Sequence, residues 1–244
     1  MRIYGINPVL EALRAGRVKE LQIREPAGGR VSELVRTAER EGVAVRRVSP
    51  GELDRAARGG VHQGVVAEVE GGSKVDLASL LAGAHGTPLL VVLDGIEDPQ
   101  NLGAILRTVD AAGAGGVVLQ ARRSAPLGGG AAKASAGALS HVKVAQVVNI
   151  ARALEVLKEA GVWTVGLAAD ATVRYDEVDF TLPTALVVGA EGSGLRRLVR
   201  ERCDWLVAIP MFGHVGSLNV SVAAGVALFE AVRQRTSASR ARRE

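Results

Sequence analysis

Apolar residues in the first part of the chain recur at both helical and strand spacing. Three of them follow Asn7 and Pro8 at helical spacing, which predicts a helix capped by Asn7 with Pro8 in its first turn. A second helix is predicted over residues 31–40. Short apolar runs predict strands at 21–23, 43–45 and 64–69. We therefore expect residues 1–70 to form a small α/β domain.

From Leu89 onward, short apolar runs alternate with helical patterns, which is typical of a mostly parallel sheet covered by helices. The predicted strands are 89–93, 116–119, 142–144, 162–167, 185–188 and 206–209. The last helix is expected over 218–234, with Ser217 as its cap. Residues 71–87 are rich in glycine and contain one amphipathic turn, so they are predicted to be a linker before a second domain at 88–244.

Composition adds a weak indication of a polyanionic partner. The 244 residues carry a formal charge of +4, and the pI is about 9.6. Aromatic residues make up only 3% of the chain and are scattered. This argues against a platform that stacks single-stranded bases, so charge and backbone shape are expected to dominate any contact with nucleic acid.

Several classes of protein have no support in the sequence. Cys203 is the single cysteine, so there is no internal disulfide or multi-thiolate metal site, and the histidines lack metal-ligand spacing. We therefore expect no metal. No signal peptide or membrane span is predicted, so the expected compartment is the cytoplasm and no membrane partner is expected. GxSxG, HExxH, P-loop and GxGxxG motifs are also missing, which removes the common hydrolase, metalloprotease and nucleotide-binding patterns.

Three loops after predicted strands are unusual, and ligands of parallel sheets collect at such positions. The first, 94–103, leads into a helix that carries Arg107, which could be a solvent-facing arginine paired with Asp110. The second, 186–195, contains Glu191, whose carboxylate would repel a phosphate and suits a cation or a hydroxyl. The third, 208–219, enters a helix of small residues that suits close packing or a subunit interface.

Together these loops resemble, in order and spacing, the three motifs of the SpoU (TrmH) family of RNA 2'-O-ribose methyltransferases. The matching stretches are NLGAILRT around Asn101, GAEGSGL around Glu191 and IPMFGHVGSLNVSVA around Asn219. GINPVLEAL near the N-terminus and the residues from His62 to Val65 resemble the substrate-binding domain of the family's 23S rRNA guanosine 2'-O-methyltransferases.

This resemblance implies a small N-terminal α/β RNA-binding domain plus a C-terminal α/β trefoil-knot (SPOUT) methyltransferase domain. It further implies S-adenosyl-L-methionine as cofactor, ribosomal RNA as partner and a homodimer formed through the C-terminal domain. The residues that would contact the cofactor are Gly189, Ala190, Ile209, Met211 and Leu218. The residues that would form the reaction centre are Asn101, Arg107, Glu191, Ser217 and Asn219.

The expected reaction is attack of a ribose 2'-oxygen on a sulfonium methyl group. The resemblance assigns Arg107 as the base, but a guanidinium hardly deprotonates. We therefore expect Arg107 to bind the adjacent phosphate and to stabilise the developing alkoxide, while Glu191 and Asn219 hold the hydroxyl or the arginine. Lys133 is either a contact to the RNA backbone or a solvated lysine. Two alternatives stay open: a tRNA 2'-O-methyltransferase, and a non-catalytic RNA-binding ribosome-assembly protein.

Overall fold

The computed structural model describes residues 1–69, 74–83 and 86–241, which contain two β-sheets. The first sheet, near the N-terminus, has the strand order β1-β4-β2-β3, with β4 antiparallel to β1 and β2, and with β2 parallel to β3. Its elements are β1 (Arg2–Tyr4), α1 (Ile6–Arg14), β2 (Val18–Arg24), α2 (Gly29–Arg40), β3 (Ala44–Val48), α3 (Pro50–Ala56) and β4 (Val65–Val69). This part of the chain is an α/β unit, as the hydrophobic pattern predicts.

Two N-terminal helices begin in different ways. Ser49 and Glu52 form a capping box at the start of α3. The prediction that Asn7 caps α1 is wrong, because α1 already begins at Ile6. The backbone N–H of Ile6 instead donates to Oε1 of Gln63 at 3.0 Å. A side chain far along the chain therefore supplies the acceptor that a local cap would supply.

The second sheet has eight strands in the order β10-β12-β9-β11-β6-β7-β8-β5, and every pairing within it is parallel. Its strands are β5 (Lys74–Val75), β6 (Leu89–Asp94), β7 (Gly116–Gln120), β8 (Val144–Val147), β9 (Trp163–Leu167), β10 (Val173–Arg174), β11 (Thr184–Gly189) and β12 (Trp205–Ala208). The predicted strand at 142–144 forms later, at 144–147, while the other five predicted strands agree to within one residue at each end.

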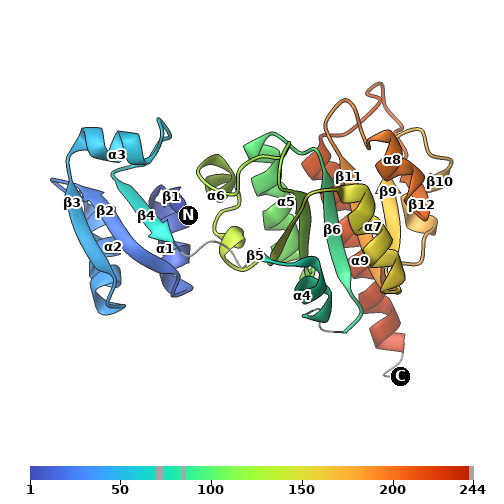
Figure 1. Cartoon of the computed structure of the whole chain (residues 1–244), viewed down its shortest axis with the longest axis horizontal. Coiled ribbons are helices and arrows are strands. Elements are labelled where there is room, and N and C mark those ends of the chain that lie inside the picture. The colour runs from blue at the N-terminus through green and yellow to red at the C-terminus, as the bar shows by residue number, and fades with distance from the viewer. Residues whose placement is uncertain (70–73, 84–85, 242–244) are drawn as a thin grey trace.

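Helices cover both faces of this sheet (Figure 1). The helices are α4 (Leu77–Ala82), α5 (Pro99–Ala111), α6 (Gly130–Ala134), α7 (Ile150–Glu159), α8 (Arg197–Glu201) and α9 (Val220–Ala241), and 3-10 turns lie at Ala138–Ser140 and Tyr175–Glu177. Val91 and Leu93 of β6 pack in one cluster with residues of α5 and α9. Leu90 and Val92 pack in the other with residues of α4, α7 and α8. The strand is fully buried because alternate side chains enter two cores.

Part of the expected linker belongs to the C-terminal sheet. Lys74 and Val75 pair with β8 and form the edge strand β5, and Leu80 of α4 is fully buried against the sheet. The amphipathic turn that the sequence indicates is therefore a short helix packed on the sheet. The rest of the linker prediction, at 71–73 and 84–85, lies outside the described residues.

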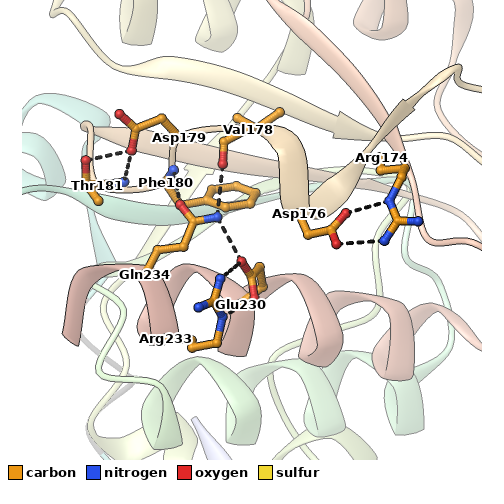
Figure 2. A network of polar contacts seen from close by, with 9 residues as sticks. All are labelled: Arg174, Asp176, Val178, Asp179, Phe180, Thr181, Glu230, Arg233 and Gln234. Atoms are coloured by element: carbon orange, nitrogen blue, oxygen red, sulfur yellow. Dashed lines mark hydrogen bonds and ion pairs between the residues drawn. The ribbon is translucent and has the colours of Figure 1, made fainter. Parts of the chain in front are cut away.

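The long helix α9 is tied to a distant segment that precedes β11 (Figure 2). Gln234 accepts from the backbone N–H of Phe180 at 2.8 Å and donates to the carbonyl of Val178 at 3.1 Å. Gln234 also donates to Glu230, which accepts from Arg233. Phe180 is buried beneath this network. The helix is thereby fixed in position, which fixes the loop residues at its N-terminus.

Candidate active site

The second and third unusual loops meet at the carboxyl ends of β11 and β12. Ala190 and Gly194 bond to each other through both backbone N–H groups, at 3.1 and 2.8 Å, and so close a tight loop after β11. A Cβ added at Gly189 would lie 2.1 Å from the carbonyl carbon of Gly194. Only glycine allows two backbone segments to approach this closely, which explains why the loop after β11 needs a glycine at position 189.

A buried ion pair holds the end of the same loop. Asp94, the last residue of β6, is completely buried, and its carboxylate accepts from the backbone N–H of Arg196 at 2.8 Å and from Nε at 2.7 Å. Nη2 of Arg196 also donates to Asp94 and to Oε1 of Gln120. The sequence pattern did not predict this ion pair. The signal was available, because Asp94 is the one charged residue that ends the apolar run LLVVLD.

Three of the five expected reaction-centre residues are joined by hydrogen bonds. Asn219 donates from Nδ2 to Oδ1 of Asn101 at 3.0 Å, and Asn101 donates from Nδ2 to Oε2 of Glu191 at 3.0 Å. Oδ1 of Asn219 accepts from the backbone N–H and the hydroxyl of Ser221 at 2.9 and 2.6 Å. Each amide therefore has a defined orientation, and Oε1 of Glu191 has no hydrogen bond within the described parts of the chain.

The same contacts correct the expected cap of the last helix. α9 begins at Val220, and the side chain of Asn219, not Ser217, accepts the orphan N–H of its first turn. Ser217 lies two residues further back in the loop. Asn219 therefore has two roles, because it caps α9 and also orients Asn101.

A cavity of about 340 Å³ lies beside this hydrogen-bonded chain. Its walls are mostly apolar, from β9, β11, β12 and their following loops, and Glu191 and Asn219 contribute polar atoms at one side. All five expected cofactor contacts line it, as does Ser217. A mainly apolar pocket with few polar groups is typical of a small-molecule site.

Arg107 does not reach this cavity. It follows Asn101 by six positions on α5, so it lies about 240° around the helix and about 9 Å along it. Its side chain is exposed and makes no hydrogen bond or ion pair with the described residues, so the alternative pairing with Asp110 is not formed in them. In a single copy of the chain the reaction centre therefore lacks its expected guanidinium.

Three other features of the described residues concern the cysteine thiol, metal ligands and membrane-spanning helices. Burial raises the pKa of the Cys203 thiol to about 12, so it stays protonated near neutral pH. Within residues 1–69, 74–83 and 86–241, no group of acidic, histidine or cysteine side chains could hold a metal ion. In these same residues, no helix is long and apolar enough to cross a bilayer.

Comparison with known families decides the assignment of the fold. Residues 88–229 match the SpoU rRNA methylase family, and residues 2–74 match the RNA 2'-O ribose methyltransferase substrate-binding family. The chain belongs to the SpoU rRNA methylase family. The N-terminal match contains the whole first sheet, and the C-terminal match contains every strand of the second sheet except the edge strand β5.

Similar SpoU proteins include both a curated relative and solved structures. The chain is 46% identical over 242 residues to the 23S rRNA (guanosine-2'-O-)-methyltransferase RlmB of Pseudomonas syringae, covering 97% of this chain and 96% of that one. The SpoU methyltransferase AviRb of Streptomyces viridochromogenes, solved with the cofactor AdoMet, has a TM-score of 0.79 at 30% identity, covering 97% of this chain and 91% of that one.

A second solved SpoU structure matches over a smaller part of the chain. The A. aeolicus TrmH/SpoU tRNA modifying enzyme has a TM-score of 0.58 at 34% identity and covers 67% of this chain and 84% of that one. These likenesses confirm the expected fold class, a small N-terminal α/β domain plus a C-terminal α/β trefoil-knot (SPOUT) methyltransferase domain.

Proposed function

We propose that this SpoU chain transfers a methyl group from S-adenosyl-L-methionine to the ribose 2'-hydroxyl of a guanosine in 23S rRNA. The observation that carries the proposal is the chain of hydrogen bonds from Asn219 through Asn101 to Glu191, beside an apolar cavity. The 23S rRNA relative matches this chain nearly end to end, whereas the tRNA enzyme matches only two thirds of it. This difference favours rRNA over tRNA as the substrate.

The two domains divide the work in this proposal. Residues 1–70 bind the RNA, and residues 88–244 bind the cofactor and carry out the transfer, with 71–87 between them. The match of residues 2–74 to a substrate-binding family supports this division. The protein acts in the cytoplasm, where ribosomal RNA is available.

The cavity beside Glu191 fits the cofactor in size and chemistry. Its volume is at the lower end of the range for small-molecule pockets, about 300–1,000 Å³. Its apolar walls suit an adenosine ring, and the Glu191 carboxylate at its edge suits a positively charged sulfur. Gly189, Ala190, Ile209, Met211 and Leu218 hold the cofactor, which supplies a methyl group on a sulfonium centre.

The side chains of the site prepare the ribose hydroxyl. Asn101 occupies Oε2 of Glu191, which leaves Oε1 to accept a hydrogen bond from the 2'-hydroxyl. Ser217 and Asn219, on the loop before α9, border the cofactor cavity and position the sugar from the other side. Holding the hydroxyl in line with its target converts a weak nucleophile into a well-oriented one. Glu191 takes up the proton or passes it to water.

A second copy of the chain supplies Arg107 in our proposal. Val222 and Phe229 of α9 lie seven residues apart on one face, and each is 50% exposed. Thr108, next to Arg107 on α5, lies close to Gly225 on the same helix, so α5 and α9 share one surface. A homodimer built on this surface covers the apolar residues and brings Arg107 to the partner's site, where its guanidinium binds the phosphate beside the reacting ribose.

Transfer of labelled methyl groups to RNA tests the proposed function. We expect transfer from S-adenosyl-L-methionine to unmodified 23S rRNA, at one guanosine, and loss of transfer in Glu191→Ala even at saturating cofactor. Transfer to tRNA and not to 23S rRNA would overturn the substrate assignment. Cofactor binding with no transfer to any RNA would favour a non-catalytic RNA-binding protein.

Mixing two inactive variants tests the role of the dimer. If Arg107 acts on the partner's site, equal amounts of Arg107→Ala and Glu191→Ala, unfolded and refolded together, regain about a quarter of the wild-type activity, because half of the dimers are mixed and one site in each is intact. If Arg107 acts within its own chain, the mixture stays inactive.

A further inference from the structure

A second cavity, of about 400 Å³, adjoins the cofactor cavity. Ala190, Glu191, Gly194 and Val220 line both of them. The second cavity is also lined by residues 94–98, at and after the end of β6, and by Arg123 after β7. Glu191, the proposed partner of the ribose hydroxyl, therefore lies where the two cavities meet. A nucleoside whose ribose is held there can place its base in the second cavity.

Three of the charged side chains in this cavity already have structural partners. Asp94 is paired with Arg196, and Asp98 accepts the backbone N–H groups of Gln100 and Asn101 as the cap of α5. The two carboxylates and the guanidinium therefore stabilise the fold, and we assign them no contact with a ligand.

Two other charged side chains have no such structural role. Glu97 and Arg123 are exposed, line the cavity, and make no hydrogen bond or ion pair with the residues that the structure describes. The cavity thus presents one carboxylate and one guanidinium whose hydrogen-bonding atoms are open to a ligand.

The backbone holds Arg123 at the cavity in an unfavourable conformation. The backbone φ angle of Arg123 is +60°, a value that residues other than glycine rarely adopt. The loop is fixed on both sides, because Ala121 donates to the carbonyl of Val147 and Ala125 donates to that of Ile96, both at 2.8 Å. Backbone strain of this kind is concentrated at functional sites.

The charges of the cavity favour a neutral ligand with both donors and acceptors. A phosphate inside it would face the carboxylates of Glu97 and Glu191. A nucleobase carries no charge. Guanine alone offers two adjacent donors, N1–H and the N2 amino group, on one edge, and two adjacent acceptors, O6 and N7, on another. These edges match a carboxylate and a guanidinium, and arginine paired with O6 and N7 is a common specific contact to guanine.

We propose that this second cavity holds the guanine base of the methyl acceptor, with Glu97 accepting from N1–H and the N2 amino group and Arg123 donating to O6 and N7. The proposal rests on the proposed function and adds to it the residues that select guanosine. Glu97 and Arg123 are specificity-determining residues, and the reaction itself stays with the groups around Glu191.

Base analogues at the methylated guanosine test each contact separately. Inosine lacks the N2 amino group, and 7-deazaguanosine lacks N7. The full-length protein and its Arg123→Ala and Glu97→Ala variants are assayed for kcat/KM on an rRNA fragment that carries guanosine or one analogue at that position. Arg122→Ala is the matched control, because Arg122 is an exposed neighbour that lines neither cavity.

The wild-type protein should lose about 5- to 100-fold in kcat/KM with either analogue. Arg123→Ala should lose a similar factor on guanosine but discriminate little against 7-deazaguanosine, and Glu97→Ala should discriminate little against inosine. Arg122→Ala should discriminate as the wild type does. Ratios between substrates do not depend on the fraction of folded enzyme, so a partly unfolded variant still gives a result.

If the wild type is active and both variants discriminate between guanosine and the analogues as the wild type does, the base pocket is wrong while the proposed function stands. An Arg123→Ala variant that is equally slowed on guanosine and 7-deazaguanosine would identify a contact to phosphate instead. If the wild type methylates no RNA, the proposed function fails and the base pocket fails with it.

Discussion

The ion pair between Asp94 and Arg196 gives the sharpest test of how the active-site loop is held. Arg196→Ala removes a guanidinium that donates to Asp94 from two nitrogens and to Gln120 from one of them. The buried carboxylate of Asp94 then keeps one hydrogen bond, from the backbone N–H of residue 196. A charge left buried and unpaired is costly, so the free energy of unfolding should fall.

The size of the loss follows from burial. Removing one partner of a buried pair costs about 3–5 kcal/mol. Because the Arg196 side chain is 42% exposed, water reaches the gap that it leaves, and we expect the lower end, about 3 kcal/mol. For a chain of this length, that loss corresponds to a fall in Tm of about 6–12 °C.

Thermal unfolding measured by circular dichroism compares this variant with its neighbour. Arg197→Ala breaks an exposed pair with Glu201, whose side chains are 77% and 52% exposed, and should lower Tm by under about 2 °C. Adding Asp94→Asn to Arg196→Ala should restore part of the lost stability, because the unpaired charge is gone. Equal small shifts for both single variants, or a double variant less stable than Arg196→Ala, would refute the reasoning.

Three further predictions follow from the site. Gly189→Ala should abolish cofactor binding in calorimetry, because its Cβ would lie 2.1 Å from backbone. Gly213→Ala should bind the cofactor normally, because Gly213 does not line the cavity and has nothing within 4 Å of an added Cβ. Asn101→Asp places a second carboxylate against Glu191 and should lower kcat at least about tenfold in the methyl-transfer assay. An unchanged kcat would contradict the hydrogen bond that Asn101 donates to Glu191. Cys203 should react with iodoacetamide about a thousandfold more slowly in the folded protein than in denaturant, because burial raises its pKa from 9.0 to about 12.

The raised pKa of Cys203 also sets the direction of a stability change with pH. The folded state keeps the proton that the unfolded chain loses near pH 9, so the free energy of unfolding should fall as pH rises from about 9 towards 12. Below pH 9 both states hold the proton and this contribution is fully present. The slope should be shallower in Cys203→Ser, and an unchanged slope would exclude Cys203 as its source.

Much of the fold could be predicted because it depends on local patterns. The buried strand β6 has a continuous apolar run that ends in a charged residue, and α5 starts with Asp98 and Pro99, which fit the first turn of a helix. The cap of α9 could not be chosen so simply. Ser217 and Asn219 are both good cap residues two positions apart, and the hydrogen bond to Asn101, a residue far away in the chain, is part of what holds Asn219 in place.

The site could be predicted only as a set of loops. Asn101 and Glu191 are 90 positions apart, and Asn101 and Asn219 are 118 apart, so no local pattern gives their hydrogen bonds. The second cavity was missed for a similar reason. Glu97 and Arg123 follow different strands, and their shared cavity depends on β6 and β7 being neighbours in the sheet.

The position of Arg107 follows from helix geometry once α5 is accepted. Six positions turn the helix by about 240°, so one copy of α5 cannot present Asn101 and Arg107 to the same point. The motif that contains both residues therefore presents them on two different sides of the helix. Asn101 faces the hydrogen-bonded chain of its own copy, and Arg107 is exposed on the surface of α5, the helix that packs against α9. If a second copy packs on this surface, α5 serves two sites at once, and the reaction centre requires the dimer and not merely a stable monomer.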